Sequence, residues 1–226
     1  RQLGESLWRR ESSGADCVGI EITGHRFNSD QEEICRLPFG LHSIFMSELT
    51  RIVIVGAGGL GREVLATLRA VNAARKQSNV LGFLDSTPGL LGTEVSGVPV
   101  LGDDNWCRNN SDASLRFICA IGDPKIRYRV VNKLSAMNCK FASAVHPDVR
   151  VPESVKIGDG TVIMAGTQFT TDVTIGAHVV VYVNCSITHD VRVGDFCLIA
   201  SGCTLSGESV LEVGVSLGTG ANILPR

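Results

Sequence analysis

Hydrophobic positions in the C-terminal part of the chain recur every six residues. From Val155 to Arg226 the sequence divides into twelve consecutive hexads without insertion or deletion, and the third residue of each is large and apolar. The two preceding hexads, residues 143–154, keep the same frame. So regular a repeat indicates one short structural unit used many times. The third positions are Val145, Val151, Ile157, Ile163, Phe169, Ile175, Val181, Ile187, Val193, Ile199, Leu205, Leu211, Leu217 and Ile223.

A period of six fits neither an amphipathic helix nor an alternating strand, and it is typical of a parallel β-helix. Each hexad then supplies one short strand and one corner, three hexads complete a triangular coil, and residues 18 apart stack on one another. Gly158, Gly176 and Gly194 follow that spacing at the fourth hexad position. We therefore predict that they form tight corners with positive φ, which glycine adopts readily.

Residues 51–137 have a different texture, in which strands alternate with helices. An apolar strand at 51–55 leads through a glycine run at 56–61 into a helix that starts at Arg62. Further strands are expected at 80–84 and 116–121, followed by a helix at 124–137. Strands that alternate with helices predict a parallel α/β sheet. The expected fold is thus a small Rossmann-like α/β domain followed by a parallel β-helix, with the boundary near Cys139.

The glycine run matches G-x-G-x-x-G between a strand and a helix, the context that gives this pattern its meaning. Gly56, Gly58 and Gly59 would let the backbone approach phosphates at the helix N-terminus. Asp85, at the end of the next strand, would accept a hydrogen bond from a ribose or base. Only about 90 residues precede the hexads, enough for one mononucleotide-binding half. A mononucleotide or nucleotide sugar is the expected ligand, and a turn used only for packing is the alternative.

Composition narrows the partners. A net charge of −2 and the absence of a Lys/Arg cluster on a periodic face argue against nucleic acid, and no apolar run is long enough for membrane insertion. No CxxC pair occurs among the eight cysteines. Cys185, Cys197 and Cys203 share the first hexad position with valines, which indicates packing rather than metal or disulfide chemistry, and a reducing cytoplasm is the expected location.

Residues 1–45 show no sustained period and precede Met46, which has the look of a start. We expect residues 1–45 to be a non-native or disordered extension. The expected domains are then residues 46–138, binding a nucleotide sugar, and residues 139–226, forming the β-helix.

One histidine stands out as a candidate base. His146 and His178 are expected to be solvated corner residues, whereas His189 lies in mid-repeat with Asp190 beside it. The 18-residue spacing places Thr171 below His189 and Gly207 above it. A glycine there would leave open space and an accessible backbone N–H, which could stabilise the oxyanion of a tetrahedral intermediate. Histidine is a working base near neutral pH, and Asp190 could fix its tautomer.

From Met46 onward the chain resembles the sugar acetyltransferases of the left-handed β-helix superfamily that carry an N-terminal nucleotide-sugar-binding domain. It is most similar to UDP-4-amino-sugar N-acetyltransferases and sialic-acid-type O-acetyltransferases. The resemblance rests on VGAGGLGREV, GFLDS, AVHP, NCSITHD and the hexads. It implies a left-handed coil, a homotrimer, acetyl-CoA as co-substrate bound between neighbouring β-helices, and a histidine general base for direct transfer.

The resemblance also assigns roles to individual residues. The implied catalytic set is His189 as base, Asp190 as its acidic neighbour and Gly207 as oxyanion donor. Two positions depart from the family: Leu60 stands where a histidine is usual, and the chain ends at Arg226 without the last coil, so we expect a C-terminally truncated β-helix. The residues implied in substrate binding are Asn184, Gly56, Gly58, Gly59 and Asp85.

Three other functions remain open at this stage. The same chemistry could act on a sugar hydroxyl instead of an amino group. A trimeric metalloenzyme of the γ-carbonic anhydrase kind needs three convergent histidines, but only His178 and His189 lie in the regular coils and they fall on different corners. A non-catalytic nucleotide-sugar-binding protein would keep the glycine turn without the transfer reaction.

Overall fold

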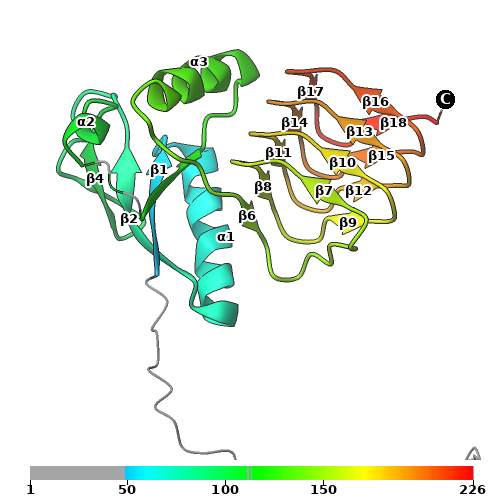
Figure 1. Cartoon of the computed structure of the whole chain (residues 1–226), viewed down its shortest axis with the longest axis horizontal. Helices are drawn as coiled ribbons and strands as arrows, with labels where there is room; N and C mark the ends of the chain where they lie inside the picture. Colours follow the sequence, from blue (N-terminus) through cyan, green and yellow to red (C-terminus); the bar gives the residue numbers. More distant parts are fainter. Residues whose placement is uncertain (1–48, 111, 113, 226) are drawn as a thin grey trace, which may run out of the picture. The chain divides into compact units, whose positions relative to one another are not determined.

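The structure is a computed structural model that describes residues 49–110, 112 and 114–225 (Figure 1). The expectation for residues 1–45 therefore lies outside the described residues. Within them, an α/β domain leads into a stack of two-residue strands, the expected α/β domain followed by a left-handed parallel β-helix.

The α/β domain contains a five-stranded sheet of order β3-β4-β2-β1-β5. Strands β4, β2, β1 and β5 are parallel, and β3 pairs antiparallel with β4. The helices that accompany the sheet are α1 (Gly59–Arg75), α2 (Trp106–Asn110) and α3 (Pro124–Ser135). The strands are β1 (Thr50–Val55), β2 (Ser78–Leu84), β3 (Glu94–Val95), β4 (Val98–Gly102) and β5 (Leu115–Cys119).

Strands β3 and β4 and helix α2 are additions to the elements expected from the sequence. The β3–β4 hairpin turns at Ser96 and Gly97, both with positive φ (52° and 73°). Two-residue turns with that geometry match the twist of antiparallel strands. The Ser-Gly pair was the signal in the sequence. Because β3 has only two residues, no alternation of apolar side chains accompanies it.

Local signals place the helices. Helix α1 starts three residues earlier than expected, because Gly59 and Gly61 belong to its first turn. It buries one apolar face, including Val64, Leu65 and Leu68. Helix α3 begins at Pro124 after Asp123, whose carboxylate accepts a hydrogen bond from Ile126 N at 2.9 Å. Proline in the first turn and aspartate at the N-cap are favoured helix starts.

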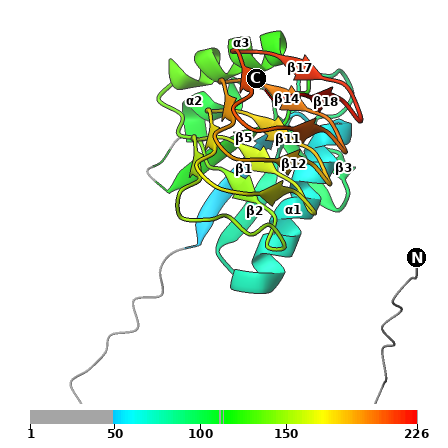
Figure 2. The same cartoon turned by 90° about the vertical axis from the view of Figure 1, so that its right-hand side faces the viewer.

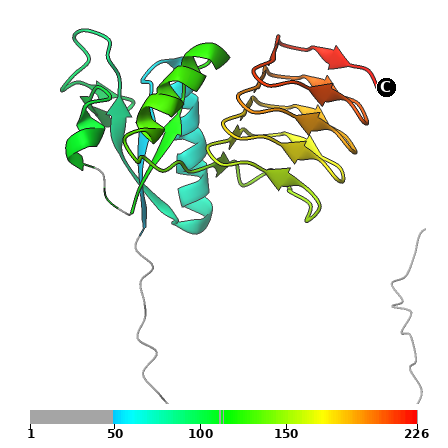
Figure 3. The same cartoon turned by 45° about the horizontal axis from the view of Figure 1, so that its top comes forward.

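The β-helix confirms the 18-residue stacking. In the D face, for example, Thr174 pairs with Lys156 on one side and Arg192 on the other. Figures 1 and 3 show the strands stacked coil upon coil, and Figure 2 shows the same coils from the side. Face C contains β6 (Ala144–Val145), β8 (Val162–Ile163), β11 (Val180–Val181), β14 (Leu198–Ile199) and β17 (Ser216–Leu217); face D contains β7 (Lys156–Ile157), β10 (Thr174–Ile175), β13 (Arg192–Val193) and β16 (Val210–Leu211); face E contains β9 (Gln168–Phe169), β12 (Ser186–Ile187), β15 (Thr204–Leu205) and β18 (Asn222–Ile223).

The interior of the β-helix is filled by the first and third residues of the hexads. Cys185, Cys197 and Cys203 are buried there without disulfides. Their thiols donate to carbonyls of the next coil, such as Cys197 Sγ to Glu212 O at 3.0 Å. Burial raises the pKa of Cys185 and Cys197. The prediction that these cysteines serve packing is confirmed.

The corner prediction for Gly158, Gly176 and Gly194 is wrong. None of the three has positive φ. A Cβ on Gly176 would lie 2.7 Å from Asp195 N and 2.8 Å from Gly194 C, so these positions require glycine because successive backbones approach closely. The positive φ occurs instead at the sixth hexad position, at Gly160, Gly166, Asp172, His178, Asn184, Asp190, Phe196, Gly202, Glu208, Gly214 and Gly220.

His178 and His146 are not solvated corner residues, which corrects a second expectation. His178 is only 9% exposed, and its ring stacks on Phe196 at 5.1 Å and meets Phe141 edge-on at 4.7 Å. Its Nδ1 has no hydrogen-bond partner among the described residues. The side chain of His146 is 17% exposed. Adjacent aromatic rings, which sequence spacing did not bring together, account for the burial of His178.

Face C packs against the α/β domain. Val162, Met164 and Val180 from this face share one apolar cluster with Ile52 and Leu65. This is why the second residues of β8 and β11's hexads are buried, whereas the corresponding residues of faces D and E are polar and more exposed. The contact joins the domain with the glycine turn to the repeat with the candidate base.

Replacing Gly176 with Ala should destabilise the protein by about 1–3 kcal/mol, since the new Cβ would meet backbone atoms that cannot move independently of the coil. Gly218→Ala is the matched control, because that fourth-position glycine has nothing within 4 Å of the added carbon. Urea unfolding of both variants measures the difference. Equal stabilities would contradict the close-approach explanation.

Replacing His178 with Phe should weaken the loss of stability in acid. Burial, and then the positive charge of Arg127, lower the pKa of His178 from 6.5, although Asp195 and Asp159 oppose this. Below about pH 6.5 the unfolded state then binds more protons than the folded state, so stability falls as pH falls. The slope is at most about 1.4 kcal/mol per pH unit. Urea unfolding at pH 7.5 and 5.5 should show a smaller loss in the variant; equal losses would refute the assignment.

Candidate functional site

The glycine turn between β1 and α1 uses its glycines in two ways. Gly56 has φ 103°, and a Cβ there would lie 2.8 Å from Ala120 O; at Gly61 it would lie 2.0 Å from Gly56 O. These two glycines are required by packing. Gly58 and Gly59 are exposed and have nothing within 4 Å of an added Cβ, so they leave the backbone at the start of α1 open. Backbone N–H groups exposed at a helix N-terminus favour anions.

Asp85 fixes this turn. Its Oδ2 accepts a hydrogen bond from Ala57 N at 2.8 Å, and its Oδ1 accepts one from Thr87 N at 2.8 Å. Burial alone would raise the pKa of Asp85, but the hydrogen bonds from Ala57 and Thr87 outweigh it and lower the pKa. The carboxylate is therefore charged at neutral pH and ties the end of β2 to the glycine turn. Its predicted contact with a ribose or base remains a prediction.

A cavity of about 500 Å³ adjoins Asp85. It lies where β2 and β4 end, and the carboxyl ends of parallel strands are where open α/β sheets bind ligands. Its walls include Asp103, Asn105 and Trp106. Sequence reasoning missed these residues because it missed β4, although Gly102-Asp103 after an apolar run repeats the Leu84-Asp85 pattern.

The second part of the candidate site is the corner between faces E and D. His189 Nδ1 lies 3.0 Å from Asp190 Oδ2, and both side chains are 57% exposed. Backbone hydrogen bonds anchor the corner on both sides: Asp190 N donates to Thr171 O at 3.2 Å, and Glu208 N donates to His189 O at 3.0 Å. The predicted stacking of His189 between Thr171 and Gly207 is thus present.

Gly207 makes room for the imidazole. A Cβ on Gly207 would lie 2.3 Å from His189 Cε1 and 2.5 Å from Nε2. The space above the glycine is therefore occupied by the imidazole itself, whereas the sequence suggested that it was open. In the described part of the chain, neither the Gly207 N–H nor His189 Nε2 has a hydrogen-bond partner. A base and a donor are thus left available side by side.

Polar groups extend along the same corner. Ser154 Oγ lies 3.0 Å from Thr171 Oγ1, which donates to Asp172 Oδ2 at 2.7 Å. On the other side, a shallow cavity of about 310 Å³ is lined by Asp190, Arg192, Glu208 and Val210. Arg192 and Glu208 follow from the same 18-residue counting as Gly207, which was applied only to His189.

Asn184 lies on another corner. It occupies the turn between faces C and E, with φ 59° and its Oδ1 over Gly166. The five residues from Asn184 to His189 run along face E, a distance of about 15 Å in extended chain. A single chain therefore does not bring Asn184 to His189. Leu60, which departs from the family, is buried in the apolar cluster of the α/β domain.

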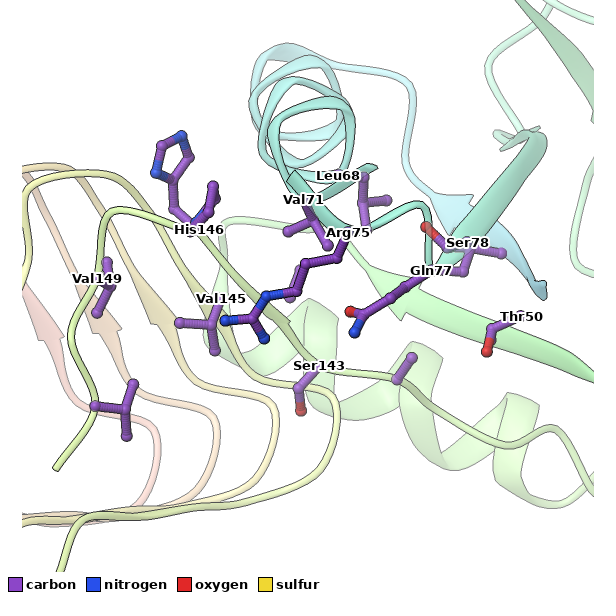
Figure 4. Close-up of a pocket in the computed structure, with 15 residues that line it drawn as sticks. Thr50, Leu68, Val71, Arg75, Gln77, Ser78, Ser143, Val145, His146 and Val149 are labelled. Carbon is purple, nitrogen blue, oxygen red and sulfur yellow. The ribbon is translucent and has the colours of Figure 1, made fainter. Parts of the chain in front are cut away.

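A further cavity of about 460 Å³ lies between the C-terminal half of α1 and the first turns of the β-helix. Figure 4 shows Arg75 and Gln77 extending toward it, with Val145 and Ser143 on the opposite wall. None of the predicted site residues lines it. Across residues 49–110, 112 and 114–225, no group of three His, Cys, Asp or Glu side chains could hold a metal ion. Those residues also contain no helix long and apolar enough to cross a membrane.

Comparisons with known families match both parts of the chain. Residues 51–134 match the PglD N-terminal domain, and residues 172–207 match the bacterial transferase hexapeptide (six repeats). The first match covers the glycine turn and Asp85, and the second covers the coils from Asp172 to Gly207. A comparison with curated protein sequences gives no significant match.

Solved structures match the described architecture across both domains. The acetyltransferase domain of PglB from Neisseria gonorrhoeae aligns with a TM-score of 0.68 and 25% identity, over 78% of this chain and 92% of that one. A histidine-to-alanine variant of GDP-perosamine N-acetyltransferase from Caulobacter crescentus, in complex with CoA and GDP-perosamine, aligns with a TM-score of 0.63 and 29% identity, over 76% and 81%. The resemblance expected from the sequence is confirmed in both parts, and the chain has the architecture of the hexapeptide-repeat sugar acetyltransferases, a class of acyltransferases.

Proposed function

We propose that this protein transfers the acetyl group of acetyl-CoA to the amino group of a nucleotide-linked amino sugar. The observation that carries the proposal is the His189 corner, where Asp190 holds Nδ1 at 3.0 Å and Gly207 presents a free N–H beside the imidazole. Two similar proteins support the substrate class: one structure carries CoA and GDP-perosamine, and the other is an acetyltransferase domain.

His189 is proposed as the general base. When Nδ1–H donates to the Asp190 carboxylate, the lone pair of the ring is on Nε2, which is the atom that would take a proton from the acceptor amine. The amine nitrogen then forms a bond to the thioester carbonyl carbon. Asp190 stabilises the imidazolium that results, and its exposed carboxylate keeps the ring oriented throughout.

Gly207 is proposed as the oxyanion donor. Attack on the thioester places negative charge on the carbonyl oxygen, and a fixed backbone N–H stabilises such charge. The tetrahedral intermediate then collapses, the carbon–sulfur bond breaks, and CoA leaves as the thiolate, which the protonated His189 can neutralise. No metal ion is required for these steps.

The α/β domain is proposed to hold the nucleotide. The open backbone at Gly58 and Gly59 suits the phosphates, with Gly56 giving the turn its shape, and the cavity beside Asp85 and Trp106 suits the nucleoside. This division of labour leaves the sugar free to extend toward the β-helix.

A homotrimer is proposed as the active assembly. The 15 Å or so between the corners of Asn184 and His189 in one chain would be closed if a neighbouring copy contributed Asn184, with acetyl-CoA bound in the groove between copies. A cytoplasmic location is also proposed, because the described cysteines are free thiols.

Replacing His189 with Ala should lower kcat about 10²–10⁴-fold, the usual contribution of a general base. The assay follows CoA thiol release from acetyl-CoA with nucleotide-linked 4-amino sugars, and with the corresponding hydroxyl sugars to test O-acetylation. His146→Gln is the control, since this histidine lies outside the corner. Thiol release that is unchanged in His189→Ala would eliminate the mechanism, and release only with hydroxyl acceptors would favour O-acetyl transfer.

Replacing Gly207 with Ala should displace the imidazole and lower kcat at least about tenfold, because a Cβ would overlap Cε1 and Nε2 of His189. Gly218→Ala, with free space around the added carbon, should retain wild-type kcat. The same thiol-release assay, run with folded variants of matched thermal stability, makes the comparison. Full activity in Gly207→Ala would argue against the proposed stacking role.

A further inference from the structure

Arg127 on α3 is completely buried, with 0% of its surface exposed, and it has no carboxylate partner in the part of the chain described here. Placing a charge in the interior costs several kcal/mol unless its donors are satisfied. Burial accordingly lowers the pKa of Arg127, though a guanidinium stays protonated at any physiological pH. A buried arginine without an acidic partner therefore needs an account.

The guanidinium donates to five backbone carbonyls. Nη1 donates to Ile121 O at 2.6 Å and Gly122 O at 2.8 Å. Nε donates to His178 O at 2.9 Å, while Nη2 donates to Phe196 O at 2.6 Å and Cys197 O at 3.0 Å. The fork geometry of arginine thus spans two carbonyls of the α/β domain and three of the β-helix.

The two α/β carbonyls belong to the edge that carries the glycine turn. Ile121 and Gly122 follow Ala120, whose N–H donates to Val55 O at 2.8 Å and whose carbonyl lies against Gly56. Any shift of these carbonyls would therefore move the proposed nucleotide-binding edge.

The three β-helix carbonyls belong to the side of the coil that starts at the catalytic corner. His178 and Phe196 occupy equivalent corners of successive coils, between faces D and C. Strand β13 (Arg192–Val193) runs from the corner of Asp190 to that of Phe196. Arg127 thus holds one end of the segment whose other end is the His189–Asp190 corner.

We propose that Arg127 is a positioning residue that fixes the nucleotide-binding edge relative to the catalytic coil, an inference that rests on the proposed acetyl transfer. The apolar contact of Val162, Met164 and Val180 with α1 is non-directional, so it can bury surface in several relative placements. The five hydrogen bonds of Arg127 are directional and select one placement. The sugar amine, anchored through its nucleotide, then meets His189 in reactive geometry.

Arg127→Lys and Arg127→Met test this role. Lysine keeps the charge but carries its three donors on one atom, so it cannot reproduce the fork, and methionine removes the charge with a similar apolar stem. Because a displacement of about 1 Å can cost about 10²-fold in rate, both variants should lose at least about tenfold in kcat. The dissociation constants of the nucleotide sugar and of acetyl-CoA, measured by calorimetry, should stay within about threefold, because each ligand keeps its own site.

Arg129→Met is the matched control, since Arg129 lies two residues further along α3 and is exposed; it should keep wild-type kcat. A kcat within about twofold of wild type in both Arg127 variants would overturn the proposal. So would a parallel tenfold loss of nucleotide-sugar affinity, which would indicate direct binding, or a failure of both variants to fold, which would indicate a folding role. If wild type and Arg129→Met both lack acetyl transfer, it is the proposed function that fails.

Discussion

The structure depends on the backbone hydrogen bonds that join residues 18 apart in successive coils. Each short strand has only two residues, so no strand is stable by itself, and the stack as a whole satisfies the backbone groups. The same constraint explains the fourth-position glycines. Where Gly158, Gly176 and Gly194 stack, the next coil passes so close that a methyl group would overlap its backbone.

The stacking also creates the candidate site. A corner residue finds the side chains of the coils above and below at fixed positions, so His189 lies over Gly207 and beside its own neighbour Asp190 without a dedicated loop. The geometry comes from the backbone ladder, and the chemistry comes from which residue types occupy the column. A rigid scaffold that presents a base next to an unpaired N–H suits a reaction in which charge develops on a carbonyl oxygen.

Much of this arrangement could be predicted from the sequence, because a strict period converts sequence distance into spatial distance. Counting 18 residues placed Gly207 against His189 and located the strands. Features that depend on contacts between different periods were missed. The burial of His178 arises from Phe141, outside the repeat, and no spacing relates Arg127 to the carbonyl of Phe196. The cavity residue Trp106 was missed because β4 is short and follows a tight hairpin.

The central claim is that acyl transfer takes place where His189 stacks on Gly207. A crystal structure of the protein with acetyl-CoA and a nucleotide-linked amino sugar tests it most directly. The account predicts that the thioester oxygen lies within about 3 Å of the Gly207 nitrogen and that the sugar amine lies within hydrogen-bond reach of His189 Nε2. A thioester bound at any other corner of the β-helix, away from His189, would contradict it.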